Sequence, residues 1–459
     1  MDQQEIKQST NNNEGEIYIK QDSLDYQQPE LSKDPDNQWF CMRSKAFDAL
    51  TAKEKAQQLF GNNKRILAPM VRASTTPLRV LAIKYGADVV YSEEMVDRSI
   101  LTCHRILNPK LGTIDYLRDK SEMSTKQLRK MRKNTLNPSL EIDNLNLPVV
   151  LRLFPAVERD KFVYQMGTGE PNLALEAALK VQHDVCGIDI NMGCPKKFSV
   201  SGGMGQALLE DAKRACSIIS ILKQHLPHLP ISAKIRFLPT PTQTISFVNA
   251  LQQAGVDAIA IHARYAGQDP SDTLAQWDQL APVIASISVP TIINGDLFTQ
   301  DEIQSVRLST GSDSVMLARP AFYNLSLFSS TKTSARVPQH QVIQDFLKYA
   351  LQFQANYQNA KYVVCEMLSQ RRVHVSKLPK LDFKLDAPFQ DHNIGLVCQQ
   401  KNLENLCKLW KVDFINQAPV DFVPTDQVYD DRYFLDPQGL KNDRESQQHE
   451  HPSKRIKAS

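Results

Sequence analysis

Residues 187–209 read GIDINMGCPKKFSVSGGMGQALL, and this stretch decides how the rest of the chain is interpreted. Its first residues alternate in the way that a short buried strand does. The strand runs directly into Asn191 and then into Cys194, which is held between a glycine and a proline. A glycine cluster and an apolar helical segment follow. The pattern indicates a strand that delivers a thiol to a loop.

The same rhythm recurs on both sides of this stretch. Segments such as LEAALKVQHDV, with apolar residues three and four positions apart, separate short apolar strands. The expected strands are residues 65–70, 88–94, 162–167, 187–193, 232–237, 258–264, 290–296 and 314–320. Eight strands in about 260 residues match an α/β fold, the (β/α)8 TIM barrel. A doubly wound sheet is the alternative, but no GxGxxG motif follows the first strand.

The chain of 459 residues divides into four predicted parts. Residues 1–40 are a polar segment that we expect to be disordered, and residues 63–330 form the barrel. Residues 335–415 are helical, and residues 424–459 form a second disordered polar tail. Two segments depart from the barrel pattern. Residues 149–154 are an extra strand, placed in a hairpin inserted before the third barrel strand, and residues 117–145 predict an exposed excursion.

Composition narrows the class of protein. Hydrophobic residues make up 42% of the chain, and the net charge of +3 is nearly neutral, so any basic surface must be local. There is no apolar run long enough to span a membrane. The eight cysteines include no CxxC pair, so we expect reduced thiols and no metal site. We expect a monomer in the cytoplasm, and the basic end KRIKAS also permits nuclear import.

The helical part carries a local charge surplus. Nine Lys or Arg stand against three Asp or Glu between residues 332 and 384, with Tyr349, Tyr357 and Tyr362 interleaved. A phosphate-binding surface and an ordinary solvated helix face with buried tyrosines are about equally good interpretations of this composition.

Polar side chains gather where the predicted strands end. In a parallel barrel these ends build the active site, and phosphate binds after the last two strands. Gly295 and the Ala318–Arg319 backbone stand at that position, which predicts a phosphate-bearing ligand. Lys234 needs a partner, which can be a phosphate, a carboxylate or an electron-rich ring such as a reduced flavin.

Cys194 allows two chemistries. With an ordinary thiol pKa of about 8.5 it stays protonated at neutral pH and can act as a general acid. If Lys234 or Arg236 lowers its pKa, it becomes a nucleophile instead. A purely structural cysteine fits poorly beyond a strand end, where Gly193 and Pro195 fix the backbone.

The chain resembles the tRNA-dihydrouridine synthases. The form NMGCPK followed by FS and SGGMG is most similar to the eukaryotic branch that modifies uridine 20 of the tRNA D-loop. The further matching motifs, in order, are LAPMVRAST (67–75), YSEEMVD (91–97), AKIRFL (233–238), AIHAR (260–264), INGD (293–296) and LARP (317–320). The resemblance covers about residues 63–370.

This resemblance implies an FMN-bound barrel with a C-terminal helical tRNA-binding domain. It implies that NADPH, or NADH, reduces FMN and that uridine is then reduced to 5,6-dihydrouridine, with Cys194 as the proton donor. The implied cofactor-binding residues are Pro69, Met70, Val71, Gln165, Lys234, His262, Asn294, Gly295, Asp296, Ala318 and Arg319. The implied substrate-binding residues are Asn191 and Arg236 at the uracil, and the helical part adds Lys361, Arg371 and Arg372 as candidate contacts to tRNA.

Two other functions remain open from the sequence. A flavoenzyme of the dihydroorotate dehydrogenase type shares the barrel, FMN and a uracil-like substrate, but it needs no basic helical segment. A tRNA chaperone that has lost catalysis has no need of Cys194, Lys234 and His262 together.

Overall fold

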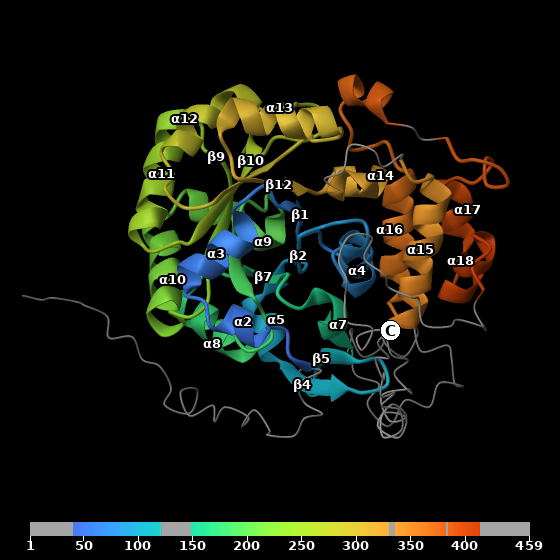
Figure 1. Cartoon of the computed structure of the whole chain (residues 1–459), viewed down its shortest axis with the longest axis horizontal. Helices are drawn as coiled ribbons and strands as arrows, with labels where there is room; N and C mark the ends of the chain where they lie inside the picture. The colour runs from blue at the N-terminus through green and yellow to red at the C-terminus, as the bar shows by residue number, and fades with distance from the viewer. Residues whose placement is uncertain (1–39, 120, 122–147, 330–335, 382–383, 414–459) are drawn as a thin grey trace, which may run out of the picture.

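The computed structural model describes residues 40–119, 121, 148–329, 336–381 and 384–413. Its centre is a closed barrel of eight parallel strands, as predicted (Figure 1). The barrel strands are β1 (Arg65–Leu67), β2 (Val89–Tyr91), β7 (Phe162–Gly167), β8 (Gly187–Met192), β9 (Ile231–Phe237), β10 (Ala258–Tyr265), β11 (Thr291–Asn294) and β12 (Ser314–Leu317). Pairing of β2 with β7 closes the barrel, and the short β3 (Met95–Val96) also pairs with β7.

Helices alternate with these strands and cover the barrel from outside (Figure 1). They bury one apolar face each, and reciprocal capping boxes begin α11 at Thr240 and α13 at Thr299. The helices are α4 (Thr76–Lys84), α5 (Asp97–Leu101), α7 (Pro155–Glu158), α8 (Pro171–Val181), α9 (Lys197–Ser201), α10 (Ala212–His225), α11 (Pro241–Gln253), α12 (Leu280–Ala285), α13 (Gln300–Thr310) and α14 (Arg319–Tyr323). Short 3-10 turns are η2 (Gly205–Leu209), η3 (Trp277–Gln279) and η4 (Leu325–Phe328).

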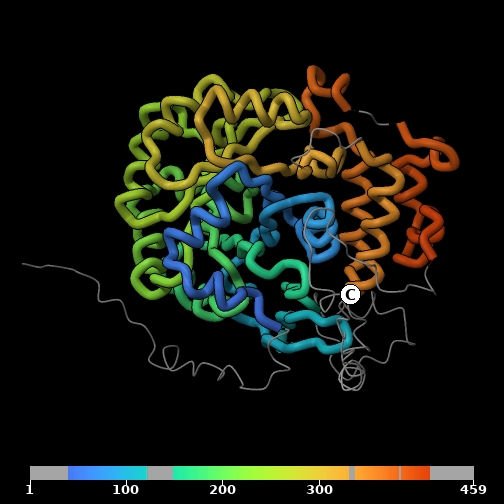
Figure 2. The backbone as a smooth tube through the Cα atoms, in the orientation of Figure 1, coloured from blue at the N-terminus to red at the C-terminus, as the bar shows by residue number. Residues whose placement is uncertain are grey.

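Two N-terminal helices precede the predicted barrel boundary at residue 63. They are α2 (Lys45–Asp48) and α3 (Ala52–Phe60), and Figure 2 shows this stretch in blue lying across the barrel. Phe47, Leu59 and Phe60 belong to the same buried cluster as Ile66 and Val163 of the barrel strands. The amino-terminal helices therefore pack on the barrel interior, which leaves the opposite, carboxyl ends of the strands for a site.

The insertion before the third barrel strand is larger than the predicted hairpin. It is a separate antiparallel sheet of β4 (Cys103–Asn108), β5 (Thr113–Arg118) and β6 (Val149–Leu153). The predicted strand 149–154 is the third member of this sheet. The predicted excursion at 117–145 lies almost entirely outside the described residues, as do the predicted disordered segments 1–40, apart from its last residue, and 424–459.

Helices beyond residue 335 pack against one side of the barrel (Figure 1). They are α15 (Gln339–Gln352), α16 (Tyr357–Leu368), α17 (Ile394–Gln399) and α18 (Leu403–Leu409), with η5 (Val375–Lys380) between α16 and α17. α15 lies against α4 and α16 against α14. Glu302 of α13 fixes η5 by accepting hydrogen bonds from Lys377 and Lys380, each at 2.6 Å.

Candidate active site

Strand register brings the predicted residues to one level of the barrel. Asn191 of β8 lies opposite Lys234 of β9, and His262 of β10 lies opposite both Arg236 and Asn294. The carboxyl ends of parallel strands share one edge, so these side chains surround a single opening. We call this opening the barrel mouth.

The Cys194 loop is held from both sides. Asn191 Oδ1 accepts hydrogen bonds from the amides of Gly193 and Cys194 at 3.0 and 3.1 Å. The Cys194 carbonyl accepts one from Gln206 at 3.0 Å. Gly205 has φ of +59°, and a Cβ there would lie 2.6 Å from the Cys194 carbonyl oxygen. Gly205 of the motif is therefore needed so that the thiol loop can pack closely on the following turn.

The thiol of Cys194 is kept protonated by its surroundings. Burial, then the charge of Glu94, raises the pKa of Cys194 above its ordinary value. The thiol donates a hydrogen bond to the Glu94 carboxylate, which also accepts from Ser199 at 3.4 Å. Of the two chemistries open from the sequence, this environment favours the general acid.

Lys234 is a partly buried cation near the carboxylates of Asp189 and Glu94. Burial, together with the nearby Arg236, lowers the pKa of Lys234 to about 8. Its ammonium makes no hydrogen bond or ion pair with any residue that the structure describes. A buried charge in this state is costly unless a ligand meets it, so the site is suited to an electron-rich or anionic group.

Gln165 and His262 each keep one polar atom for a ligand. Gln165 is 2% exposed and donates to Asp189 Oδ2 at 2.8 Å, which leaves its carbonyl oxygen as an acceptor. Burial and the surrounding cations hold the pKa of His262 well below its usual value, so the ring is neutral. Arg264 approaches Nε2 of His262 at 3.2 Å, and the ring proton then lies on Nδ1.

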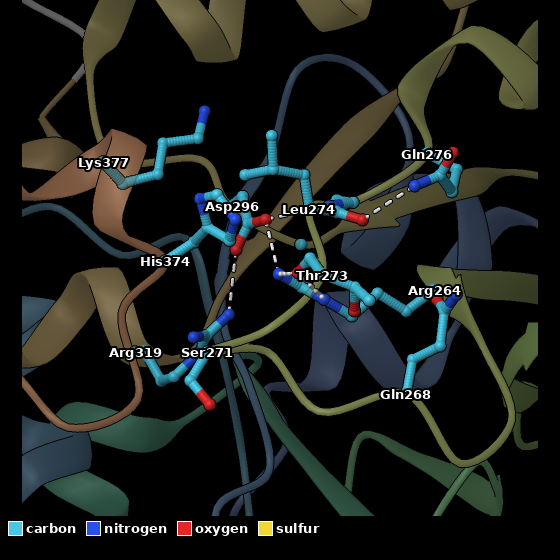
Figure 3. Close-up of polar contacts among 12 residues, drawn as sticks. Arg264, Gln268, Ser271, Thr273, Leu274, Gln276, Asp296, Arg319, His374 and Lys377 are labelled. Carbon is cyan, nitrogen blue, oxygen red and sulfur yellow. Dashed lines mark hydrogen bonds and ion pairs between the residues drawn. The ribbon is translucent and has the colours of Figure 1, made fainter.

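A buried ion-pair cluster lies after β11 and β12, and Figure 3 shows it. The Asp296 carboxylate joins Arg264 at 2.5 Å to Arg319 at 2.9 Å, and it accepts from the Ala275 amide at 2.9 Å. Its pKa lies below the usual value because these donors outweigh the effect of burial. The Asp296 side chain is therefore occupied within the protein, and only its backbone is available to an anion.

The backbone at this position forms a turn with two successive positive φ angles. Gly295 and Asp296 are consecutive residues with φ of +126° and +55°. A Cβ at Gly295 would lie 3.1 Å from both His262 Cδ2 and Ala275 Cβ. The amide of Asn294 instead donates to Met316 O at 2.8 Å, which ties β11 to β12. Ala318 and Arg319 follow β12 beside this turn, as the sequence analysis placed them.

The loop after β1 supplies the remaining predicted cofactor residues. Pro69 and Met70 are partly buried, and Val71 is 50% exposed. The next residue, Arg72, has φ of +69° and donates to the Gln358 carbonyl at 2.8 Å in α16. This loop therefore joins the barrel mouth to the helical part.

The predicted tRNA contacts differ in what their side chains do. Lys361 uses its ammonium on the carbonyls of Cys398 and Gln400, at 2.6 and 2.9 Å, and on the Tyr357 hydroxyl. The Arg372 guanidinium bonds to Tyr362. Arg371 is exposed, and its guanidinium has no partner among the residues that the structure describes. Tyr349 is buried, so the interleaved tyrosines serve packing and positioning.

The sequence pattern places Glu94 and Arg264 among the polar residues at the strand ends but gives neither of them a role. Glu94 contacts the thiol, and Arg264 is fully buried between His262 and Asp296. Both lie at strand ends, so the sequence predicts where they lie but not which residues they contact. In the described ranges there is no group of three or more His, Cys, Asp or Glu that could hold a metal, and no helix long and apolar enough to cross a membrane.

Comparison with known proteins assigns the chain to a family. A family model described as dihydrouridine synthase (Dus) matches residues 145–414, more than half of the chain. The chain belongs to the Dus family. This confirms the resemblance read from the cysteine motif and from the ordered strand-end motifs.

Two fungal relatives of this Dus protein carry the name tRNA-dihydrouridine(20) synthase, followed by NAD(P)+. The chain is 33% identical to that of Schizosaccharomyces pombe over 67% of its own length and 60% of the relative's. It is 33% identical to that of Saccharomyces cerevisiae over 68% of its own length and 78% of the relative's. The chain thus spans less than two thirds of the first relative. A solved 2-naphthoyl-CoA reductase complex resembles 59% of this chain and 51% of its own, with a TM-score of 0.38 and 11% identity.

Proposed function

We propose that this Dus protein reduces the C5=C6 bond of uridine 20 in the D-loop of tRNA to 5,6-dihydrouridine. The observation that carries the proposal is the protonated Cys194 thiol at the barrel mouth, near the unpartnered Lys234 ammonium. Membership of the Dus family and the names of the two fungal relatives support the reaction and the position. The relatives' names also support a nicotinamide cofactor, and we propose NADPH, with NADH as the alternative.

We propose FMN as the resident cofactor, because the residues present fit it. Lys234 offers an unpartnered cation, Gln165 an acceptor, and neutral His262 a donor on Nδ1. A Cβ at Gly295 would lie 3.1 Å from both His262 and Ala275, so the positive φ and close packing of this turn need a glycine, and we place the phosphate at its backbone. When bound, reduced FMN supplies the hydride that is added to C6 of the uracil ring.

The chain's own residues provide placement and a proton. Cys194 donates its proton to C5, so that the S–H bond breaks as the C–H bond forms. The Gly193 and Cys194 amides donate to Asn191, and the Gln206 amide donates to the Cys194 carbonyl. These hydrogen bonds hold the thiol in one place while the uracil ring is positioned. Arg236 Nη1 is held by the carbonyls of Tyr265 and Gln268 at 3.2 and 3.3 Å, which leaves the rest of its guanidinium for the uracil oxygens.

The target uridine must leave its stack to reach the barrel mouth. We propose that the helical part, residues 335–415, holds the rest of the tRNA, with exposed Arg371 making the first phosphate contact. Arg372 is the weaker candidate because Tyr362 already binds it. Lys361 is the weakest because its ammonium joins α16 to the carboxyl end of α17. We further propose that the protein acts as a monomer in the cytoplasm.

The test uses purified full-length protein and an unmodified tRNA transcript. We expect a flavin absorbance spectrum, NADPH oxidation that depends on tRNA, and dihydrouridine that disappears when uridine 20 is replaced by cytidine. Cys194→Ala should keep the flavin and lose dihydrouridine formation by about 100-fold or more. A colourless protein that takes up no FMN contradicts the proposal, and turnover of dihydroorotate in place of tRNA favours the small-substrate alternative.

A further inference from the structure

The position of Glu94 is set by the pairing of β3 with β7 and not by β2, the barrel strand that precedes it. β2 ends at Tyr91, and the chain turns before β3, where Val96 lies opposite Gly167 of β7. This turn directs the Glu94 carboxylate toward the Cys194 loop, where it accepts a hydrogen bond from Ser199 at 3.4 Å and lies beside the side chains of Cys194 and Asn191. Gly167 lies directly against it, since a Cβ there would be 2.8 Å from Glu94 Oε1.

Opposite charges compete for the thiol. Lys234 and Arg236 of β9 lie near enough to Cys194 that its charged form raises the pKa of both, and reciprocally they favour a thiolate. Glu94 acts in the opposite direction through both its charge and its hydrogen bond. Ser199 of α9 and the Lys196 amide also bond to the thiol and favour the thiolate. Burial is the largest cause of the raised pKa of Cys194, and Glu94 is the charged group facing the thiol that acts in the same direction.

We propose that Glu94 is the positioning residue for the Cys194 proton: its carboxylate accepts the S–H bond, opposes the two β9 cations and fixes the direction of the thiol. Without it, the pKa of the same cysteine beside Lys234 and Arg236 falls, although burial still opposes ionisation, so that more of the nucleophilic thiolate is present at neutral pH. Its role in uridine reduction rests on the proposed function, but its effect on the free thiol does not.

The experiment measures the reactivity of Cys194 in the full-length protein without tRNA. The protein is labelled with iodoacetamide across the pH range, and the rate at the Cys194 peptide is read by mass spectrometry, because the other cysteines also react. In the native protein we expect the labelling midpoint above the ordinary thiol value of about 8.5. In Glu94→Gln the midpoint should fall, and labelling near neutral pH should rise about tenfold.

A second variant keeps Glu94 and moves it. Gly167 does not have a positive φ, so Gly167→Ala is compatible with the backbone, and its Cβ must displace the carboxylate. Labelling should rise in the same direction, by a smaller factor. Glu93→Gln is the matched control, since Glu93 is the adjacent partly buried carboxylate, and it accepts from the Arg72 amide instead. This control should change the labelling rate less than twofold.

The proposal is overturned if Glu94→Gln keeps the native labelling profile, or if Glu93→Gln shifts it equally. A merely structural Glu94 would lower the melting temperature and leave the midpoint unchanged. With tRNA, Glu94→Gln should move the upper limit of the pH profile for dihydrouridine formation to lower pH. A shifted midpoint in a native protein that reduces no tRNA would refute the proposed function and leave the role of Glu94 intact.

Discussion

Replacing Asp296 by Asn tests whether one carboxylate organises the ligand-facing turn. Asp296 is 2% exposed and joins Arg264, whose side chain is fully buried, to Arg319, which is 14% exposed. Asparagine keeps the shape and one acceptor oxygen but removes the charge. The substitution therefore leaves two neighbouring guanidinium groups repelling each other in a site from which water is largely excluded.

The magnitude follows from these contacts. Two unit charges about 4 Å apart attract by about 4 kcal/mol at an effective dielectric constant of about 20. Asparagine retains part of the hydrogen bonding, and Arg264 keeps the Thr273 carbonyl at 2.8 and 3.0 Å. We therefore expect a loss of about 3 kcal/mol in the free energy of unfolding, the lower end for breaking a buried pair. That corresponds to a fall of roughly 6 to 12 °C in melting temperature.

The pH dependence has a defined sign. The pKa of Asp296 is lowered in the folded protein, so its contribution is fully present above the unfolded value of about 3.9 and is lost as pH falls through the folded value. The difference between native protein and Asp296→Asn should thus be constant near neutral pH and should narrow only below about pH 4.

Urea unfolding followed by circular dichroism measures this difference. Asp269→Asn is the matched control, because Asp269 is exposed in the neighbouring loop and bonds only locally to Ser271, so it should change stability by less than about 0.5 kcal/mol. If Asp296→Asn is as stable as this control, the carboxylate does not organise the turn, and the account of the cluster in Figure 3 is wrong.

Two further predictions concern ligands. Gly295→Ala should weaken flavin uptake, measured by absorbance per mole of protein, because the added Cβ would crowd His262. Gly311→Ala is the control. Gly311 also has a positive φ, but nothing lies within 4 Å of the added Cβ, so this variant should lose stability and keep flavin uptake. Arg371→Glu should weaken tRNA binding and reduce the slope of log affinity against log salt by about one, whereas Lys361→Met should lower the melting temperature and leave that slope unchanged. An unchanged slope in Arg371→Glu would make this stretch a solvated face.

The strands of the barrel could be predicted because each one is itself a short apolar segment that is buried in the fold. Every predicted barrel strand is present, with differences only at the ends. β4 and β5 were missed because they form by pairing with each other and with β6, and most of β4 is only partly buried. α3 was missed for a related reason, since it is stabilised by the barrel interior that it covers.

The sequence could predict which residues lie at the site but not which residues each of them contacts. Strand ends identified Cys194, Lys234 and His262, because a parallel barrel brings those ends together. Glu93 and Glu94 are equivalent in sequence, and only the turn into β3 decides which one reaches the thiol. Lys361 counts as a basic residue in any composition, yet its ammonium binds carbonyls within the protein. The charged residues of a sequence can be counted, whereas the direction in which each charged side chain points depends on tertiary packing.

The distribution of charge at the barrel mouth fits the proposal that one opening holds an anionic ligand beside a protonated acid. Asp296 neutralises Arg264 and Arg319 on the side of β11 and β12, and Glu94 sets the thiol on the side of β8. Lys234 lies on β9, where the charges of Asp189 and Glu94 act on it, and it has neither Glu94 nor Asp296 as a hydrogen-bond partner. If Lys234 formed an ion pair with Glu94, the Cys194 thiol would lose its hydrogen-bond acceptor. The ligand would also lose the cation that faces it. The separation of these charges on different strands is therefore what allows Cys194 to remain an acid in a cationic site.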